Sequence, residues 1–377
     1  MSKSLAEVLS EIDDPEAVDF ILNEVRGHDT SSAEATDEIV STTLQQQYDR
    51  FLRRRQNRSP TTIAQYKRTI PDLIDYAENN KVRSPYQLST DLIDGYVDLL
   101  MERYDADATI LTYTKNAGVF LRWLNARNKC SEAVYEVLSK DALGLSPKAR
   151  DEAIPEPVAR HIIEQLHQHR RGSHLHAAME LFWNGGPRIG DVYSADLRDF
   201  LPEENTLKFR HRPEEGTRLK NGSADDDTVG DGERDIILKD RVVDALQLYI
   251  NTERPDVKDD FGREPLFATK YGRAARSTLR RWIYEATSCR WAPRMQDTPD
   301  CNGNCDPDSS VCPCSYYPHA IRRGAIVHHL SGDLRQDRAS QRFDVSIPIL
   351  KKHYDPRTKS RQLADRADAV RDAWADW

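Results

Sequence analysis

The strongest signal in this chain is a seven-residue stretch, residues 318–324, which reads PHAIRRG. Proline is favourable in the first turn of a helix, because its missing N–H would have no intrahelical partner there. A helix that opens at Pro318 places His319 and Arg322, three residues apart, on one face. A His–Arg pair one turn apart is more often structural than catalytic, so its meaning depends on partners elsewhere in the chain.

Three other positions carry side chains suited to chemistry. Arg188 follows a tight turn in residues 184–191, NGGPRIGD, and Lys220 stands in a turn-like LKNG between two strand-like segments. Tyr354 lies among basic residues near the end of the chain. Taken singly, the arginine and the lysine are typical of solvated surface groups, and the tyrosine is typical of an anchor with its hydroxyl in water. Their order along the chain changes this interpretation.

The order Arg, Lys, His-x-x-Arg, Tyr, after a helical domain, resembles the tyrosine recombinase (phage integrase-like) family over about residues 40–360. Residues 62–66, TIAQY, match its T-x-x-x-Y opening, and NGGPRIGD matches its T-G-x-R-x-x-E motif with Asp191 in place of glutamate. LKNG matches the β-hairpin lysine, and PHAIRRG matches the H-x-x-R box. Tyr354 follows Arg322 by 32 residues, where the family has its nucleophile. The Lys-His-Tyr-Asp ending and a cysteine-rich insert look most like haloarchaeal integrase-like proteins.

The resemblance implies cleavage and rejoining of DNA strands. Tyr354 is expected to attack the phosphodiester, form a 3′-phosphotyrosyl ester and release a 5′-hydroxyl. Arg188 and Arg322 are expected to clamp the negative charge of the phosphorane-like transition state. Lys220 suits protonation of the leaving 5′ oxygen, and His319 suits removal of the tyrosine proton. No cofactor is expected for catalysis, because the two arginines supply the positive charge.

One position departs from the family pattern. The family usually has an L-G-H motif whose His, or a Trp, lies nine residues before the tyrosine, and here that position is Val345. A valine side chain donates no hydrogen bond to a phosphate. Either Arg342 or His353 replaces the missing donor, or the site works without one. This departure lowers the expected efficiency of cleavage.

The cysteines are unevenly distributed. Cys130 stands alone, while five others fall within 26 residues. Closely spaced thiols in a cytosolic protein are typical of a structural zinc site. The expected ligands are Cys289, Cys301, Cys305 and Cys312, with Cys314 as the substitute. The alternative is a set of thiols without metal in a flexible loop.

The 377 residues suffice for two domains and an arm. Residues 1–39 read as an acidic N-terminal extension, and residues 40–150 show helical apolar spacing without strand-like alternation. Residues 151–377, which begin with a linker that contains two prolines, mix helices with short strands and contain the cysteine-rich insert 289–314. The expected fold class is mainly α. The resemblance adds a helical core-binding (SAM-like) DNA-binding domain followed by an α+β tyrosine recombinase catalytic domain.

The net charge of −8 argues against a plainly basic nucleic-acid-binding protein, but the charge is segregated. Residues 1–38 carry 11 acidic and 2 basic residues, so the remainder carries 51 and 52. Five arginines lie in residues 50–58, and six basic residues against one acidic residue lie in 263–281. Such patches are compatible with DNA binding. The charged fraction of 31% and the lack of a long apolar run predict a cytoplasmic protein without membrane association.

These observations together predict a site-specific DNA recombinase or integrase whose partner is double-stranded DNA. The resemblance implies a homotetramer on synapsed DNA that forms from free monomers or dimers. The first alternative is a catalytically weak or inactive DNA-binding member of the same fold. The second is a zinc-stabilised protein-interaction module.

Overall fold

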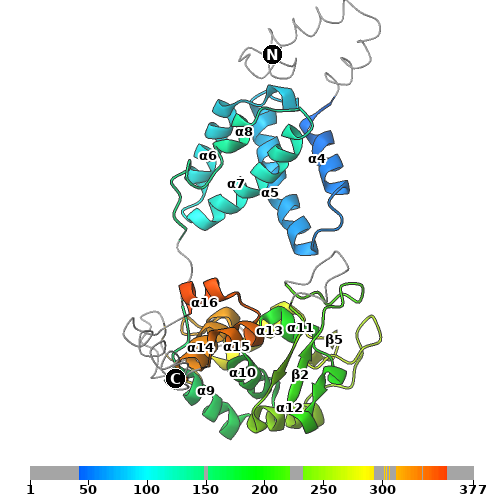
Figure 1. Ribbon diagram of the computed structural model, residues 1–377, viewed down its shortest axis with the longest axis vertical. Helices are drawn as coiled ribbons and strands as arrows, with labels where there is room; N and C mark the ends of the chain where they lie inside the picture. The colour runs from blue at the N-terminus through cyan, green and yellow to red at the C-terminus, as the bar shows by residue number, and fades with distance from the viewer. Residues whose placement is uncertain are drawn as a thin grey trace, which may run out of the picture. The chain divides into compact units, whose positions relative to one another are not determined.

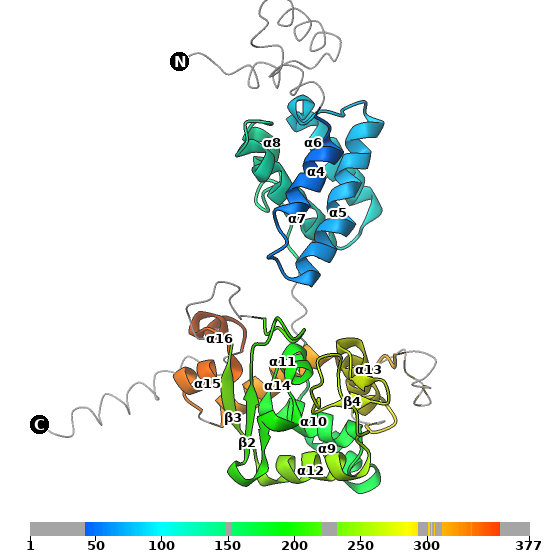
Figure 2. The same ribbon diagram turned by 90° about the vertical axis from the view of Figure 1, so that its right-hand side faces the viewer.

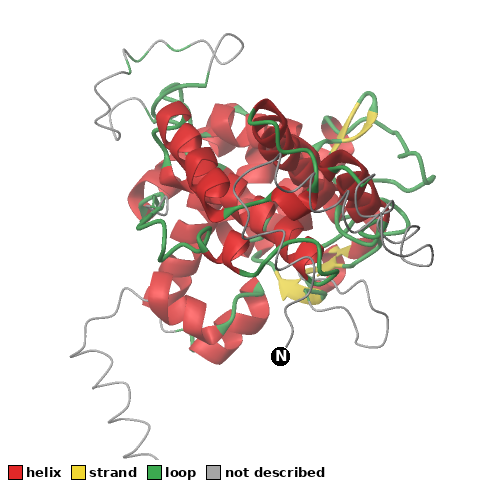
Figure 3. Ribbon diagram, turned by 90° about the horizontal axis from the view of Figure 1, so that it is seen from above, coloured by secondary structure: helices red, strands yellow, loops and turns green. Residues whose placement is uncertain are grey.

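The structure is a computed structural model that describes residues 42–147, 152–220, 232–292, 301, 303, 305, 311–332 and 334–354. The chain divides into two compact units, residues 1–150 and 151–377 (Figure 1). The expected acidic extension at residues 1–39 lies outside the described residues. Helices predominate in the part of the chain that is described, and strands are few and short (Figure 3).

The first unit is a bundle of helices. They are α4 (Leu44–Arg53), α5 (Pro60–Asn79), α6 (Thr90–Arg103), α7 (Asp107–Asn125) and α8 (Ala133–Glu136). The Ser59 side chain caps α5, and Pro60 occupies its first turn, as the sequence predicts. The helix continues through Pro71 to its end.

The core of the first unit is aromatic. Phe51 is fully buried and makes edge-to-face contacts with Tyr66, Phe120 and Trp123, which joins α4, α5 and α7. Tyr66 is the tyrosine of the TIAQY stretch, so in this structure that motif supports the core. A buried hydrogen bond from Asn116 to Thr69 (3.1 Å) further ties α7 to α5.

The second unit is built around a central helix. Its helices are α9 (Glu156–His169), α10 (His174–Gly185), α11 (Ile189–Ser194), α12 (Asp240–Thr252), α13 (Arg276–Ala286), α14 (Pro318–Ser331), α15 (Gln336–Phe343) and α16 (Ile347–His353). Eleven of the twelve residues of α10 are buried, and α9, α12, α13 and α14 pack around it (Figure 2). A helix that is buried on all sides lies in the middle of its domain, where it positions the segment that leaves its C-terminus.

Two small antiparallel sheets complete this unit. One consists of β1 (Phe200–Leu201), β2 (Thr206–Phe209) and β3 (Arg234–Ile237) in that order, with Leu207 opposite Ile236. The other consists of β4 (Ala268–Thr269) and β5 (Gly272–Arg273), which the sequence did not indicate. The fold is therefore mainly α, with a helical unit followed by an α+β unit. Among the described residues, no helix has both the length and the apolar character needed to cross a membrane.

Candidate active site and cysteine cluster

The end of α10 positions Arg188. Gly186 follows the helix with φ +56°, a left-handed conformation that favours glycine, and an added Cβ there would lie 2.7 Å from the ring of Phe343. Pro187 then leads to Arg188 at the N-cap of α11. The Asp191 carboxylate accepts hydrogen bonds from the backbone N–H of Arg188 (2.8 Å) and from the Arg234 guanidinium (2.6 Å). Asp191, in the place of the family's glutamate, thus fixes the turn that carries Arg188.

The guanidinium of Arg188 points to the start of the α15–α16 connection. Its Nη1 donates to the carboxylate of Asp344 and its Nη2 donates to the backbone carbonyl of the same residue. Both side chains are about one-fifth exposed, at 19% and 18%. Arg188 and Asp344 therefore form a partly buried ion pair with a second hydrogen bond to the backbone.

Arg322 lies beside Arg188 but is buried, with 1% of the residue exposed. Its Nη1 donates to the carbonyl of Gly186 (2.7 Å), and its Nη2 donates to the carbonyl of Phe343. Burial, and next the positive charge of Arg188, lower the pKa of Arg322 to about 10. The guanidinium therefore remains protonated at neutral pH.

His319 stands at the start of α14, three residues before Arg322, as the sequence predicts. Desolvation by the surrounding protein, and next the charges of Arg322, Arg323, Lys220 and Arg188, lower the pKa of His319 to about 4. The residue is exposed, which weakens the desolvation, but the cations act in the same direction. The imidazole is therefore neutral at pH 7 and able to accept a proton.

Lys220 lies in the connection between β2 and β3, directly before residues 221–231, which the structure does not describe, and it is exposed. Its charge is one of those that act on His319, so the hairpin brings it into the electrostatic neighbourhood of α14. The preceding residue is fixed by a hydrogen bond from the Leu219 N–H to Nδ1 of His211 (3.1 Å).

Tyr354 follows the last turn of α16, and only 7% of the residue is exposed. Its ring packs in an apolar cluster with Phe343, Val345 and Leu350, and the guanidinium of Arg323 lies 5.4 Å from the ring centroid. The backbone carbonyl of Phe343, in the same cluster, accepts the hydrogen bond from Arg322. The structure thus brings Arg188, Arg322, His319, Lys220 and Tyr354 into one region of the second unit.

At position 345, where the resemblance would place a His or Trp that donates to phosphate, the structure has an apolar side chain packed against its neighbours. Val345 is buried in the same cluster as Tyr354. Arg342, one of the suggested replacements, donates to the carbonyls of Ile237 (2.9 Å) and Asn184 (3.1 Å), so it ties α15 to β3 and α10. His353, the other, has its carbonyl within 3.4 Å of a guanidinium nitrogen of Arg323.

Two site residues were missed by sequence reasoning. Arg234 holds Asp191 and donates to the carbonyl of Arg342 (2.8 Å), while Asp344 binds Arg188. Asp344 falls at the glycine of the family's L-G-H pattern and has φ +50°, a left-handed conformation that Asp tolerates better than most residues. The presence of Asp344 where the L-G-H pattern has glycine was the feature of the sequence that could have pointed to this residue.

The structure groups four cysteines. One sulfur each from Cys289, Cys301, Cys305 and Cys312 lies within 4.8 Å of the other three, and these are the four expected ligands. The Sγ of Cys301 lies 3.7 Å from that of Cys305 and 3.8 Å from that of Cys312, too far for disulfides. These four clustered thiols could bind a structural metal.

The cysteine cluster is tied to the start of α14. Cys289 follows the end of α13, and Cys312 lies seven residues before His319. The Tyr316 N–H donates to the hydroxyl of Thr287 (3.0 Å), and the Ser315 hydroxyl donates to the carbonyl of Tyr284 (2.7 Å). The chain that enters the His319–Arg322 helix is thus fastened to α13 directly beside the cluster.

The arginines of the first unit form an exposed basic cluster. Arg50 and Arg54 lie at the end of α4 and are exposed, as is Arg127 beyond α7. Burial, and next the charges of Arg54, Arg55 and Arg50, lower the pKa of Arg127, whose guanidinium lies 4.0 Å from the ring centroid of Trp123. The fold therefore adds Arg127 to the arginines that the sequence places in residues 50–58.

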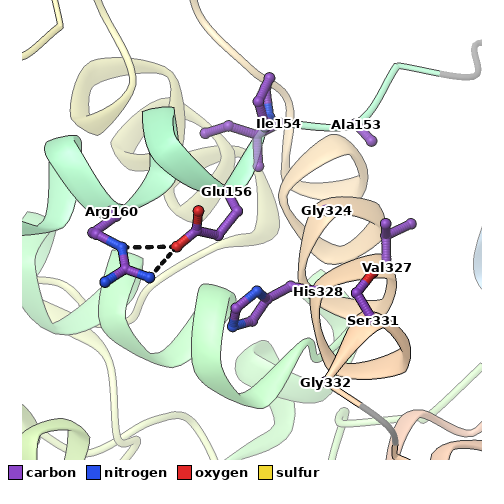
Figure 4. Close-up of a pocket in the computed structure, with 10 residues that line it drawn as sticks. Ala153, Ile154, Glu156, Arg160, Gly324, Val327, His328, Ser331 and Gly332 are labelled. Atoms are coloured by element: carbon purple, nitrogen blue, oxygen red, sulfur yellow. Dashed lines mark hydrogen bonds and ion pairs between the residues drawn. The ribbon is translucent and has the colours of Figure 1, made fainter. Parts of the chain in front are cut away.

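A groove of about 600 Å³ lies on the other face of α14 (Figure 4). It is lined by residues 153–156 and by α14 side chains including Val327 and His328, and an ion pair between Arg160 and Glu156 lies along it. Gly324 is required here, since an added Cβ would lie 2.3 Å from the carbonyl oxygen of Ile154. None of the five candidate catalytic side chains lines this groove.

Comparison with known proteins assigns the fold. No family model and no curated protein matches the chain. The Tn1549 transposon integrase in complex with transposon right end DNA superimposes with a TM-score of 0.65 at 13% identity, over 87% of this chain and 100% of that one. A lambda integrase dimer bound to a COC′ core site gives 0.57 at 13% identity, over 91% and 86%. A lambda integrase tetramer bound to a Holliday junction gives 0.55 at 13% identity, over 88% and 82%.

The chain therefore has the fold of the Tn1549 and lambda integrases, a helical unit followed by an α+β unit. This confirms the expected fold class. The narrower likeness to haloarchaeal integrase-like proteins receives no support from these structures.

Proposed function

We propose that this protein is a tyrosine-type site-specific DNA recombinase that cuts and rejoins strands through a 3′-phosphotyrosyl intermediate. The observation that carries the proposal is the convergence of Arg188 and Arg322 on one dipeptide, Phe343-Asp344, beside the apolar cluster that also holds Tyr354. Two guanidiniums side by side match the non-bridging oxygens of one phosphate.

In the proposed reaction, the Tyr354 oxygen attacks the scissile phosphorus, and the bond from phosphorus to the 5′ oxygen breaks. Neutral His319 accepts the phenol proton, which its lowered pKa permits at pH 7. Lys220 donates a proton to the leaving 5′ oxygen, and Arg188 and Arg322 stabilise the charge of the transition state. Rejoining reverses these steps with a 5′-hydroxyl from another strand, so the phosphodiester energy is retained in the tyrosyl ester.

Double-stranded DNA is the proposed partner, and the exposed arginine cluster of the first unit is proposed to contact its phosphates. A homotetramer on two synapsed duplexes is the proposed working assembly, with free monomers or dimers. The lambda integrase tetramer on a Holliday junction, which shares the fold, supports this proposal. We place the protein in the cytoplasm, where its DNA substrate lies.

A structural zinc ion is proposed for the cysteine cluster. Four thiolates at about 2.3 Å from a tetrahedral zinc ion hold their sulfurs about 3.8 Å apart. The two sulfur–sulfur distances of 3.7 and 3.8 Å agree with this value. The ion would fasten the segment that enters α14 and take no part in catalysis.

The decisive experiment uses a nicked DNA substrate that loses a short fragment after cleavage, so that the covalent complex accumulates. Because the target sequence is unidentified, a library of nicked duplexes is incubated with the full chain, and adducts are recovered under denaturing conditions. Peptide mapping is expected to place the attachment at Tyr354. Attachment at another residue would refute the assignment.

The buried Val345 favours a second candidate, a DNA-binding protein of the same fold without turnover. Such a protein binds duplex DNA with strong salt dependence and gives no covalent adduct with any member of the library. The cysteine cluster favours a third, a zinc-stabilised protein-interaction module, which would have no measurable DNA affinity at moderate salt.

A further inference from the structure

The two arginines of the proposed phosphate clamp are already engaged by one short segment of the chain. Arg188 donates to the carboxylate and the carbonyl of Asp344, and Arg322 donates to the carbonyl of Phe343. A phosphate that reached both guanidiniums would have to take the place of these acceptors.

The carboxylate of Asp344 has the chemistry of a phosphate substitute. It is an anion, and guanidinium binds carboxylate and phosphate oxygens alike. One carboxylate oxygen and the backbone carbonyl oxygen of Asp344 together occupy both terminal nitrogens of Arg188, as two oxygens of one phosphate would. Among the described residues, the Arg188 guanidinium donates only to Asp344. Asp191, the other nearby acid, is committed to Arg234 and to the turn at Arg188.

The candidate site has an excess of positive charge, which the carboxylate of Asp344 offsets. Burial, and next the positive charges that include Arg188 and Arg234, lower the pKa of Arg322. Four cationic side chains add to the effect of desolvation on the pKa of His319. Without a bound anion, these cations repel one another in a partly buried region. Asp344 supplies a negative charge at the clamp while DNA is absent.

The backbone holds Asp344 in place and links it to the nucleophile. Asp344 ends α15 in a left-handed conformation, and its N–H and that of Val345 both donate to the carbonyl of Ser340. Ten residues later, after α16, the chain reaches Tyr354, whose ring packs on Phe343 and Val345. Asp344 and Tyr354 therefore flank one short segment that is anchored at Phe343, Val345 and Leu350.

We propose that Asp344 is an autoinhibitory carboxylate that occupies the phosphate clamp until a DNA phosphate displaces it from Arg188. The role in recombination rests on the proposed function, whereas the competition with phosphate does not. While the contact persists, other anions do not reach Arg188. When a DNA phosphate displaces Asp344, the clamp opens and the α15–α16 segment is released with it.

The first test needs no DNA. The apparent dissociation constant for inorganic phosphate is measured from the phosphate dependence of thermal unfolding of the full chain. Asp344→Asn keeps a residue that tolerates the left-handed backbone, and Asp344→Gly removes the side chain altogether. Both should bind phosphate about tenfold more tightly than wild type, the factor expected if the contact occupies Arg188 about nine-tenths of the time.

Asp337→Asn is the matched control, because Asp337 lies on α15 and pairs with the exposed Arg335 (3.2 Å). It should bind phosphate like wild type, and Arg188→Ala should abolish the gain seen with Asp344→Asn. Equal phosphate affinity for wild type, Asp344→Asn and Asp344→Gly would overturn the proposal.

The second test uses nicked duplex DNA at concentrations below saturation. Asp344→Asn should form adduct about tenfold faster than wild type and lose most of that advantage at saturating DNA, because displacement is then no longer limiting. Slower cleavage by Asp344→Asn with unchanged phosphate affinity would identify Asp344 as a positioning residue for Arg188 and overturn the inhibitory role. If wild type forms no adduct, the proposed function fails, and the phosphate titration still decides the competition.

Discussion

The two units of this protein differ in whether their charged side chains are exposed or buried. In the first unit the buried polar side chains, such as Gln47, Thr69 and Asn116, are all uncharged among the residues described, and its arginine cluster is exposed. In the second unit the buried set includes Glu180 and Arg322. Burying a charge is costly unless it is paired and hydrogen-bonded, so a fold tolerates it where a fixed geometry is required. We infer that the first unit attracts DNA by its field, while the second holds charged groups in place for chemistry.

The largest effect is expected from loss of the proposed nucleophile. Tyr354→Phe should abolish covalent adducts and leave duplex affinity within about twofold, because one hydroxyl adds little to binding dominated by backbone phosphates. Adduct is measured on denaturing gels with nicked DNA, and affinity by fluorescence anisotropy. Tyr271→Phe, at an 87% exposed tyrosine, is the control and should cleave normally. Adduct formation by Tyr354→Phe would remove Tyr354 from the proposed site.

Next in size is the loss of either clamp arginine. Arg188→Ala and Arg322→Ala should each slow single-turnover cleavage by about 10²–10³, because each removes paired donors to the transition-state charge. Arg322→Ala also leaves the carbonyls of Gly186 and Phe343 without donors, so Arg322→Lys and a thermal unfolding curve accompany it. Arg335→Ala, at an 81% exposed side chain, is the control. Wild-type cleavage rates in either clamp variant would exclude that arginine from catalysis.

The cysteine cluster allows a test of how the buried site is supported. Protein purified without chelator should contain about one zinc per chain, and its removal should increase hydrogen exchange in residues 312–322 before global unfolding. Cys301→Ser should lose the metal, while Cys314→Ser, outside the quartet, should retain it. Elemental analysis and exchange mass spectrometry give the two readouts. A metal that depends on Cys314 rather than Cys301 would require a different ligand set.

A smaller effect is expected from the exposed arginines of the first unit. Arg54→Ala and Arg127→Ala should each weaken binding to all duplex sequences alike and reduce the slope of log affinity against log salt by about 1. Arg103→Ala is the control, because Arg103 is already paired with Asp72 (2.7 Å). Binding is measured by anisotropy between about 50 and 200 mM salt. An unchanged slope would remove these arginines from the DNA interface.

The smallest effect concerns pH. The pKa of His319 is lowered to about 4, so the ring stays neutral as pH falls from about 8 to about 5 and remains able to accept a proton. Proton acceptance is lost only as pH falls through about 4, instead of through the ordinary value of about 6.5. NMR titration of labelled histidines, with His319→Gln for assignment, measures this directly. A midpoint near the ordinary value would show that desolvation and the neighbouring cations do not lower the pKa of the ring as the structure indicates.

Local sequence was sufficient for much of the fold. Three helix boundaries could be predicted, because caps and turns depend on near neighbours. They are the Ser-Pro start of α5, the Gly-Gly end of α10 and the start of α14 at Pro318. The hairpin β4–β5 was not, since its two-residue strands are too short to show alternation. The set of four cysteines could be chosen from spacing, whereas their sulfur geometry could not.

By itself, the sequence determined which residue types are available and in what order, since spacing along a helix or around a turn is a local property. Only the tertiary structure decided what the charged groups contact. Arg234 lies 43 residues from Asp191, and Asp344 lies 156 residues from Arg188, so no local pattern links the members of either pair. The packing of α14 against α10 and α15, and of α15 against β3, brings them together. The high cost of an unpaired buried charge requires each to find a partner there.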